Sequence, residues 1–203
     1  MVSNTRMRFL EVATRHFAEN GFDGASIAAI ARALGLTKQA LIHHFGSKEK
    51  LYGEVLQQIS DRLLSQIIQA NVGADDPATR LEDLLLSLHE DRDGRADDTR
   101  LVLRELLDNK RRAERATNWY LKPYLDALTT LMRQVPGWET ARDAEALAAV
   151  YQIIGAIYFF AISEPTLVRM FGERAYDRLE TTYPARLRAL IRACLRNPPA
   201  APG

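Results

Sequence analysis

Residues 26–45 read SIAAIARALGLTKQALIHHF, and this stretch predicts two short helices joined by a tight turn. Ser26 is a good N-cap residue, and the apolar residues after it repeat at helical spacing. Gly35 follows, at the point where a chain leaving a helix most needs a residue that tolerates positive φ. Thr37 is placed to cap a second helix. The spacing is typical of the helix-turn-helix motif, whose second helix enters the major groove of DNA.

The packing faces of the two helices fit this motif but also fit a plainer alternative. Ala31 lies four residues before Gly35, where a large side chain would keep the helices from crossing closely. Leu41 and Phe45 give the second helix one apolar face. Two ordinary packed helices with a glycine C-cap would show the same spacing, so spacing alone leaves both interpretations open.

The flanking sequence predicts a small helical domain around this segment. A first helix is expected from about residue 5 to residue 20, because four apolar residues form a stripe along it (Phe9, Leu10, Ala13 and Phe17). Gly21 is expected to end that helix. Ser47 is a fresh N-cap before charged and then apolar residues. The first fifty residues should therefore form three short helices with one core, and a fourth helix should lead away.

The run from Phe9 to Leu56 resembles the DNA-binding domain of the TetR family of bacterial transcriptional regulators. The residues that carry the resemblance are Phe17, Gly21, Phe22, Ser26, Ile27, Ile30, Ala31, Gly35, Leu36, Thr37, Lys38, Leu41, His44, Phe45, Ser47, Lys48, Glu49, Lys50 and Leu51. The resemblance implies a DNA-binding domain over residues 1–50 and a helical regulatory and dimerisation domain over residues 51–203. Beyond about a quarter of the chain, it extends only to length and helical character.

The remaining sequence predicts helices throughout, so the expected fold class is all-α. Helices are expected at about 48–70, 77–90, 98–110, 116–133 and 143–163, then in a short segment opened by Pro165 and in a last helix that reaches Leu195. Pro184 either breaks or kinks that last helix, and the sequence does not decide which. Residues 197–203 are proline-rich and are predicted to be a disordered tail.

Charge and cysteine content limit the classes of DNA-binding protein and the cellular compartments that fit this chain. Residues 1–50 carry seven Lys or Arg and four acidic residues, a net charge of +3, whereas the whole chain is +1. A sequence-blind DNA binder should be far more basic, because such binding depends on phosphate contacts. The single Cys194 excludes an internal disulfide and indicates a reducing compartment. The N-terminus shows no apolar signal segment, so a cytoplasmic location is expected.

One apolar stretch, residues 146–162, invites a membrane interpretation. It lies at the short limit for a membrane span, and acidic residues flank it. A helix buried on all sides inside a helical bundle explains it better, so no membrane association is predicted.

The candidate DNA-contacting residues lie on and beside the second helix of the motif. Gln39 is suited to an adenine edge, Lys38 to guanine or phosphate, and Ala40 to a thymine methyl group. Lys48 is placed for a phosphate, as the resemblance implies for the matching lysine of the family. The full predicted set is Ser26, Thr37, Lys38, Gln39, Ala40, His43, His44 and Lys48.

Ile42 and His43 depart from the family pattern, which usually has an aromatic residue, most often tyrosine, at this point. Isoleucine cannot donate the hydrogen bond that the tyrosine hydroxyl gives to the DNA backbone. That contact is therefore either missing or made by His43. His43 and His44 lie ~100° apart on a helix, a poor geometry for one metal, so no metal site is predicted.

The larger domain is expected to bind a small-molecule effector in a mostly apolar pocket. The candidate residues are His89, Arg104, Leu107, Trp119, Tyr120, Tyr124, Tyr151 and Tyr158, although core packing explains each of them as well. The resemblance implies that the last two long helices pair with their copies in a second subunit. A homodimer would also place two DNA-reading helices on a palindromic operator.

No catalytic motif, phosphate-binding glycine loop or metal-ligand spacing is present in the sequence, so neither enzymatic activity nor a cofactor is predicted. The expected function is a sequence-specific transcriptional regulator, a repressor released from double-stranded operator DNA by its effector. A helical interaction module, or a bundle enzyme with a vestigial helix-turn-helix, remains as the alternative.

Overall fold

The computed structural model describes residues 2–70, 76–91, 95–107 and 120–199. The described residues form nine helices and no strand, as the all-α prediction requires. The chain divides into two compact units, of which the first contains residues 1–62 and 97–121 and the second contains residues 63–96 and 122–203. One long helix, α4 (Lys48–Ala70), begins in the first unit and ends in the second. Its bounds agree with the predicted ones.

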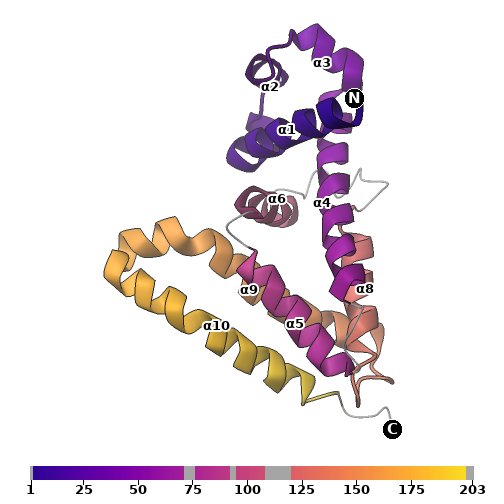
Figure 1. Cartoon of the computed structure of the whole chain (residues 1–203), viewed down its shortest axis with the longest axis vertical. Coiled ribbons are helices and arrows are strands. Elements are labelled where there is room, and N and C mark those ends of the chain that lie inside the picture. The colour runs from indigo at the N-terminus through magenta and orange to yellow at the C-terminus, as the bar shows by residue number, and fades with distance from the viewer. Residues whose placement is uncertain (1, 71–75, 92–94, 108–119, 200–203) are drawn as a thin grey trace. The chain divides into compact units, whose positions relative to one another are not determined.

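The first unit packs three N-terminal helices and a later one around the first half of α4 (Figure 1). These helices are α1 (Val2–Gly24), α2 (Ile27–Ala33), α3 (Lys38–Phe45) and α6 (Ala96–Leu107). Side chains predicted to share this core, Phe17, Ile30, Leu41 and Leu51, are fully buried. The apolar periodicity therefore located the core of the first fifty residues correctly.

Helix α1 breaks where glycine was expected to end it. Gly21 has φ 71° and ψ 177°, values that lie outside the helical region and that favour glycine. Helical hydrogen bonding resumes beyond the break and ends at Gly24, and α1 begins at Val2 rather than near residue 5. The carbonyl groups just before Gly21 thus lie at the end of a helical segment.

The second unit is built from four packed helices (Figure 1). These are α5 (Pro77–Glu90), α8 (Lys122–Met132), α9 (Asp143–Phe171) and α10 (Glu173–Leu195). Their largest fully buried side chains are Leu81, Leu84, Leu85, Leu128, Met132 and Ile153. At the start of α5, Asp76 accepts a hydrogen bond of 2.9 Å from the amide of Thr79, and Pro77 occupies the first turn as predicted.

Two prolines lie inside helices, and one of them corrects a prediction. Helix α9 continues through Pro165 to Phe171, so the expected end near residue 163 is wrong. Pro184 lies within α10, which is continuous. A proline removes one amide donor, and this local cost is outweighed when both sides of the helix are packed. Phe160 supplies such packing, because its ring stacks on Tyr183 with centroids 3.7 Å apart.

Other predicted boundaries shift or fall outside the described residues. Helix α8 begins at Lys122 after a turn at residues 120 and 121, although a start near residue 116 was predicted, and residues 116–119 are outside the described residues. Helix α6 begins at Ala96 instead of near residue 98. Also outside the described residues are the predicted end of α6, the loops at 71–75 and 92–94, and residues 200–203 of the tail predicted at 197–203.

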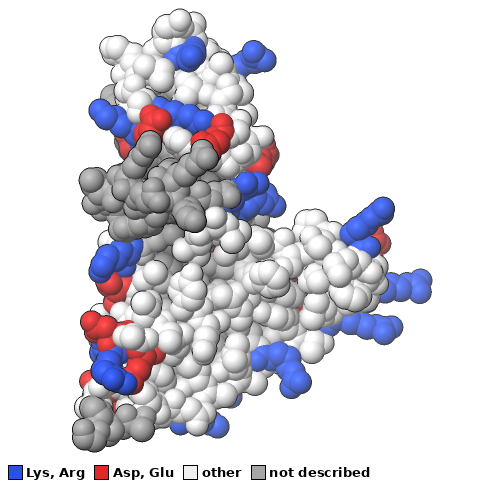
Figure 2. Space-filling view, turned by 180° about the vertical axis from the view of Figure 1, so that it is seen from behind, with Lys and Arg blue, Asp and Glu red and all other residues white. Residues whose placement is uncertain are grey.

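Helix α9 is not buried on all sides within one chain, contrary to prediction. Among the described helices, it alone is long and apolar enough by composition to cross a membrane. Of its most apolar 18-residue segment, 44% is buried within the chain. Tyr151 is 49% exposed and Phe159 is 71% exposed, with Leu147 and Gly155 exposed at the same spacing. Figure 2 shows a broad face of the second unit on which charged side chains are sparse. A single chain therefore leaves an apolar stripe of α9 uncovered.

Candidate nucleic-acid interface

The turn between α2 and α3 has the geometry that its sequence predicts. Gly35 has φ 70°, and its amide donates to the carbonyl of Arg32 at 3.0 Å. The amide of Leu36 donates to the carbonyl of Ala31 at 2.8 Å, which closes the end of α2. A Cβ on Gly35 would meet no atom within 4 Å, so glycine is required by the backbone conformation and not by lack of space.

The start of α3 is fixed by Thr37. Its hydroxyl oxygen accepts a hydrogen bond of 3.1 Å from the amide of Ala40, as expected of an N-cap. The remaining amides of the first turn lie at the positive end of the helix dipole, where an anion is favoured. Ser26 occupies the matching position before α2, but its side chain makes no capping bond there. The sequence predicted that the Ser26 hydroxyl would cap α2. In the structure this hydroxyl is exposed and does not cap the helix.

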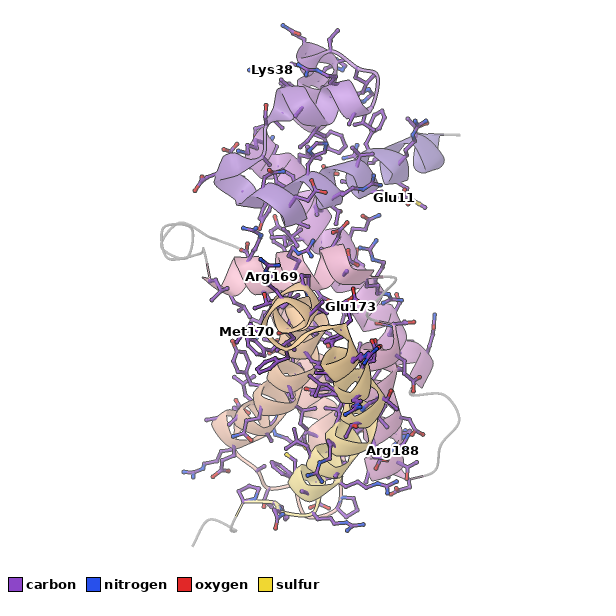
Figure 3. All side chains as sticks on the ribbon, turned by 90° about the vertical axis from the view of Figure 1, so that its left-hand side faces the viewer. Glu11, Lys38, Arg169, Met170, Glu173 and Arg188 are labelled. Carbon is purple, nitrogen blue, oxygen red and sulfur yellow. The ribbon has the colours of Figure 1, made fainter. Side chains whose placement is uncertain are left out.

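Helix α3 separates a buried face from an exposed one. Leu41 and Phe45 are buried, as predicted. The predicted readers on the opposite face are exposed or half-buried (Lys38, Gln39, Ala40, His43 and His44). Lys38 extends from α3 on the outer surface of the first unit (Figure 3). The structure thus brings these five candidates together on one short helix, with side chains of the kinds that contact base edges and phosphates.

The two histidines are in different surroundings. The ring of His44 packs edge-on against Phe9 at 5.4 Å, which ties it to α1. His43 has its ring 6.2 Å from that of His44 and remains exposed. Ile42 is half-buried, so His43 is the residue at this point of the helix that can reach a ligand.

Lys48 lies at the start of α4 and already has contacts within the unit. Its amine donates to the carbonyl of Asp23 at 3.2 Å and lies 4.7 Å from the ring centre of Phe22. An ammonium group has three donors, so this arrangement fixes the amine and leaves donors for a phosphate. Next to it, the pKa of Glu49 is lowered, first by its own backbone amide and then by the Ser47 hydroxyl.

Arg6 is a residue of this unit that the sequence analysis missed. Its guanidinium group donates to both carboxylate oxygens of Glu54, at 2.6 and 2.5 Å, and lies 4.8 Å from the ring centre of Phe45. The pair joins the start of α1 to α4 across 48 positions of sequence. No local pattern marks such a contact.

The predicted effector-binding residues do not form one group. His89, Tyr124 and Tyr158 are buried in the second unit, where the Tyr158 hydroxyl lies 3.2 Å from that of Tyr124. Burial, and then the neighbouring Tyr158, raises the pKa of Tyr124 well above its usual value. His89 packs against Phe160 and Tyr183. These three residues are the buried part of the predicted set.

The other members of that set lie elsewhere. Tyr151 is on the exposed stripe of α9, and Leu107 is 79% exposed at the end of α6. Arg104 and Tyr120 belong to the first unit, where Arg104 binds carbonyl groups of α1. Trp119 is outside the described residues. Aromatic and basic character alone did not distinguish a pocket from a surface or a helix contact.

The geometry of α2, the turn and α3 defines the class: the first unit contains a helix-turn-helix of the DNA-binding kind. Comparison with known proteins gives the family. Residues 9–55 match the family described as bacterial regulatory proteins, tetR family. Over these residues, about a quarter of the chain, the sequence is therefore similar to the TetR family.

Three sequence relatives are named as transcriptional regulators or repressors. The chain is 38% identical over 64 residues to the transcriptional repressor AcnR of Corynebacterium efficiens, covering 32% of this chain and 34% of the relative. It is 34% identical over 86 residues to the regulator UidR of Escherichia coli, covering 42% and 44%. It is 32% identical over 89 residues to the repressor KstR2 of Mycobacterium tuberculosis, covering 44% of each chain. The matched segment thus spans less than half the length of these curated relatives.

Solved structures share the fold over nearly the whole chain. A TetR-like transcriptional regulator from a Rhodococcus species matches with a TM-score of 0.65 at 16% identity, covering 95% of this chain and 96% of that one. The TetR-family regulator PfmR from Thermus thermophilus matches with a TM-score of 0.61 at 20% identity, covering 97% and 98%. The structural likeness covers nearly the whole chain, whereas these sequence matches cover less than half of it.

Proposed function

We propose that this protein is a sequence-specific DNA-binding transcriptional repressor. The observation that carries the proposal is the exposed polar face of α3, held outward by a glycine turn and a threonine cap. Gln39 and Lys38 are suited to base edges, and Thr37, His43 and Lys48 to phosphates. The modest positive charge of residues 1–50 fits a reader that relies on a few base contacts, and we retain the predicted domain boundary near residue 50 for this role.

The uncovered stripe of α9 supports a homodimer. Helix α10 also exposes apolar side chains, at Leu179 and Leu190. On α10 an open groove of about 410 Å³ is lined by Ala185, Arg188, Ala189, Arg192, Ala193 and Arg196. Alanines one turn apart let another helix approach closely, and a second copy is the occupant implied by the family. Twin readers on a palindrome would then lie 34–36 Å apart, about one turn of DNA.

We further propose that a small-molecule effector releases the operator. The buried hydroxyls of Tyr124 and Tyr158 and the imidazole of His89 are polar groups in an otherwise apolar bundle, the composition typical of a ligand site. Helix α4 belongs to both units, so a ligand that favours one position of α4 would shift the spacing of the two readers. A change of a few ångströms would prevent simultaneous contact with both half-sites.

Binding to a duplex taken from upstream of the chain's own gene tests the proposal. Wild-type protein should prefer this duplex to random duplex, with an affinity that falls steeply as salt rises. Gln39→Ala should change the sequence preference by about 1–3 kcal/mol at one base pair in each half-site. An equal affinity for both duplexes would refute the repressor function. A Gln39→Ala variant with an unaltered binding profile would remove only that base contact.

A further inference from the structure

Helix α6 holds the broken end of α1 through one arginine. The Nε of Arg104 donates to the carbonyl of Ala18 at 2.9 Å, and its Nη2 donates to the carbonyl of Glu19 at 3.0 Å. Both carbonyls lie just before the break at Gly21, where the regular helical ladder is interrupted. A cation at the end of a helical segment is also favoured by the helix dipole. The planar guanidinium group offers two donors to two successive carbonyls, which an ammonium group does not match.

The segment that follows the break carries the contacts of Lys48. Asp23 supplies the carbonyl that binds the Lys48 amine, and Phe22 supplies the ring beneath it. The position of this amine therefore depends on how residues 22 and 23 leave α1. Arg104 fixes the helical turn immediately before them, so a continuous set of contacts runs from α6 to the start of α4.

A second contact holds the aromatic side chains beside Lys48. The hydroxyl of Tyr52 donates to Glu105 at 2.7 Å, and Glu105 is the neighbour of Arg104 on α6. The Tyr52 ring lies 5.1 Å from that of Phe22 and 4.9 Å from that of Phe17. Helix α6 thus binds α1 through Arg104 and α4 through Glu105.

Further contacts join α6 and Tyr120 to α4. Asp98 pairs with Arg62 at 2.6 Å. Gly53, inside α4, admits the side chain of Tyr120, because a Cβ there would lie 2.5 Å from the tyrosine hydroxyl oxygen. Glycine is disfavoured inside a helix relative to alanine, and this close approach explains its presence here.

We propose that Arg104 is a positioning residue for DNA binding: it fixes the end of α1 and thereby directs the Lys48 amine toward phosphate. The proposal rests on the proposed function. It also places α6, more than fifty residues beyond the helix-turn-helix, in the DNA-reading unit. Residues 1–50 would then hold the DNA-contacting side chains, and α6 would support them from beyond the predicted boundary.

A double-mutant cycle on the full-length protein tests this role. The variants are Arg104→Met, Lys48→Ala and the two combined, and the probe is a fluorescent duplex from upstream of the chain's own gene. The matched control is Arg100→Met, because Arg100 is on the same helix but pairs with Asp97 of that helix at 3.5 Å. Arg104→Lys keeps the charge and loses the paired donors. The thermal midpoint of each variant is measured, so that affinities are compared on folded protein.

Arg104→Met and Lys48→Ala should each raise the dissociation constant about tenfold. The double variant should be only about two- to threefold weaker than either single variant, because both changes disable the same phosphate contact. Arg100→Met should stay close to wild type, and Arg104→Lys should lie between wild type and Arg104→Met. Effects that multiply to about a hundredfold, or an Arg104→Met variant no weaker than Arg100→Met, would overturn the proposal. A wild-type protein without preference for its own promoter would instead refute the repressor function itself.

Discussion

The turn between α2 and α3 and the hairpin of α9 and α10 are stabilised by different kinds of contact. In the turn, each feature comes from residues within a few positions of one another: the positive φ of Gly35, the Thr37 cap and the hydrogen bonds that the amides of residues 35 and 36 donate to carbonyls at the end of α2. In the hairpin, both helices pass through prolines, and Phe160 of α9 packs on Tyr183 of α10. Local chemistry thus specifies the reading element, whereas long-range packing specifies the hairpin that we assign to dimerisation.

The largest expected effect comes from charging the exposed stripe of the hairpin. Phe159→Glu should raise the dimer dissociation constant about a hundredfold, because an unpaired carboxylate would be buried at each of two symmetric positions. Sedimentation analysis measures this change. Ile68→Glu is the matched control, since Ile68 is 67% exposed and Phe159 is 71% exposed but Ile68 lies on α4. If both variants remain dimeric, the interface lies elsewhere.

Replacing glycine by alanine should change the free energy of unfolding in opposite directions in the two regions. Gly35→Ala should destabilise the protein by about 1–2 kcal/mol, because alanine is disfavoured at φ 70° although space is free. Gly155→Ala should stabilise the single chain by up to about 1 kcal/mol, because it lies inside a helix and a Cβ meets nothing within 4 Å. Denaturant unfolding in the Phe159→Glu background separates these effects from dimer contacts. Equal signs would contradict the contrast between the two regions.

At the reading surface, Lys48→Ala should weaken binding to all duplexes and lower the salt slope by about one for each reader, or about two for the dimer. The cause is the loss of one phosphate contact per reader. Lys50→Ala serves as the control, because Lys50 is exposed nearby and is not among the predicted contacts. The slope comes from affinities measured over a range of salt concentrations. A Lys48→Ala slope equal to that of wild type would exclude Lys48 from the phosphate contacts.

The smallest effect concerns the cap of α5 in the second unit. Hydrogen bonds from the Thr79 hydroxyl and amide lower the pKa of Asp76. A lowered pKa in the folded state contributes stability above the unfolded value of about 3.9, and that contribution is lost as pH falls through the folded value. Asp76→Ala should therefore lower the thermal midpoint slightly near neutral pH, and the difference should shrink in acid. The difference in thermal midpoint between Asp76→Asn and Asp76→Ala should not change over this pH range, because neither side chain ionises.

The sequence predicted most helices but misjudged those that depend on distant packing. Apolar repeats located α4 and α5, and the Asp76 and Thr37 caps are in place. The predicted end of α9 was wrong because proline was taken to stop the helix. Packing of Phe160 against α10 stabilises the continuous helix. The polar face of α3 followed from helical periodicity. The sequence did not predict that the candidate effector residues would be divided between two units, because residue type carries no information about which partner a side chain meets.

The sequence by itself determined the helix-turn-helix, because glycine conformation, threonine capping and apolar spacing act over one or two helical turns. Only the tertiary structure decided that Arg104 binds the end of α1, 86 positions away, and that α9 keeps an apolar stripe uncovered. Contacts of that length depend on how whole helices pack, and many sequences with the same periodicity would pack differently. The proposed DNA-reading surface is thus encoded locally, and the helix contacts that support it are encoded by the fold.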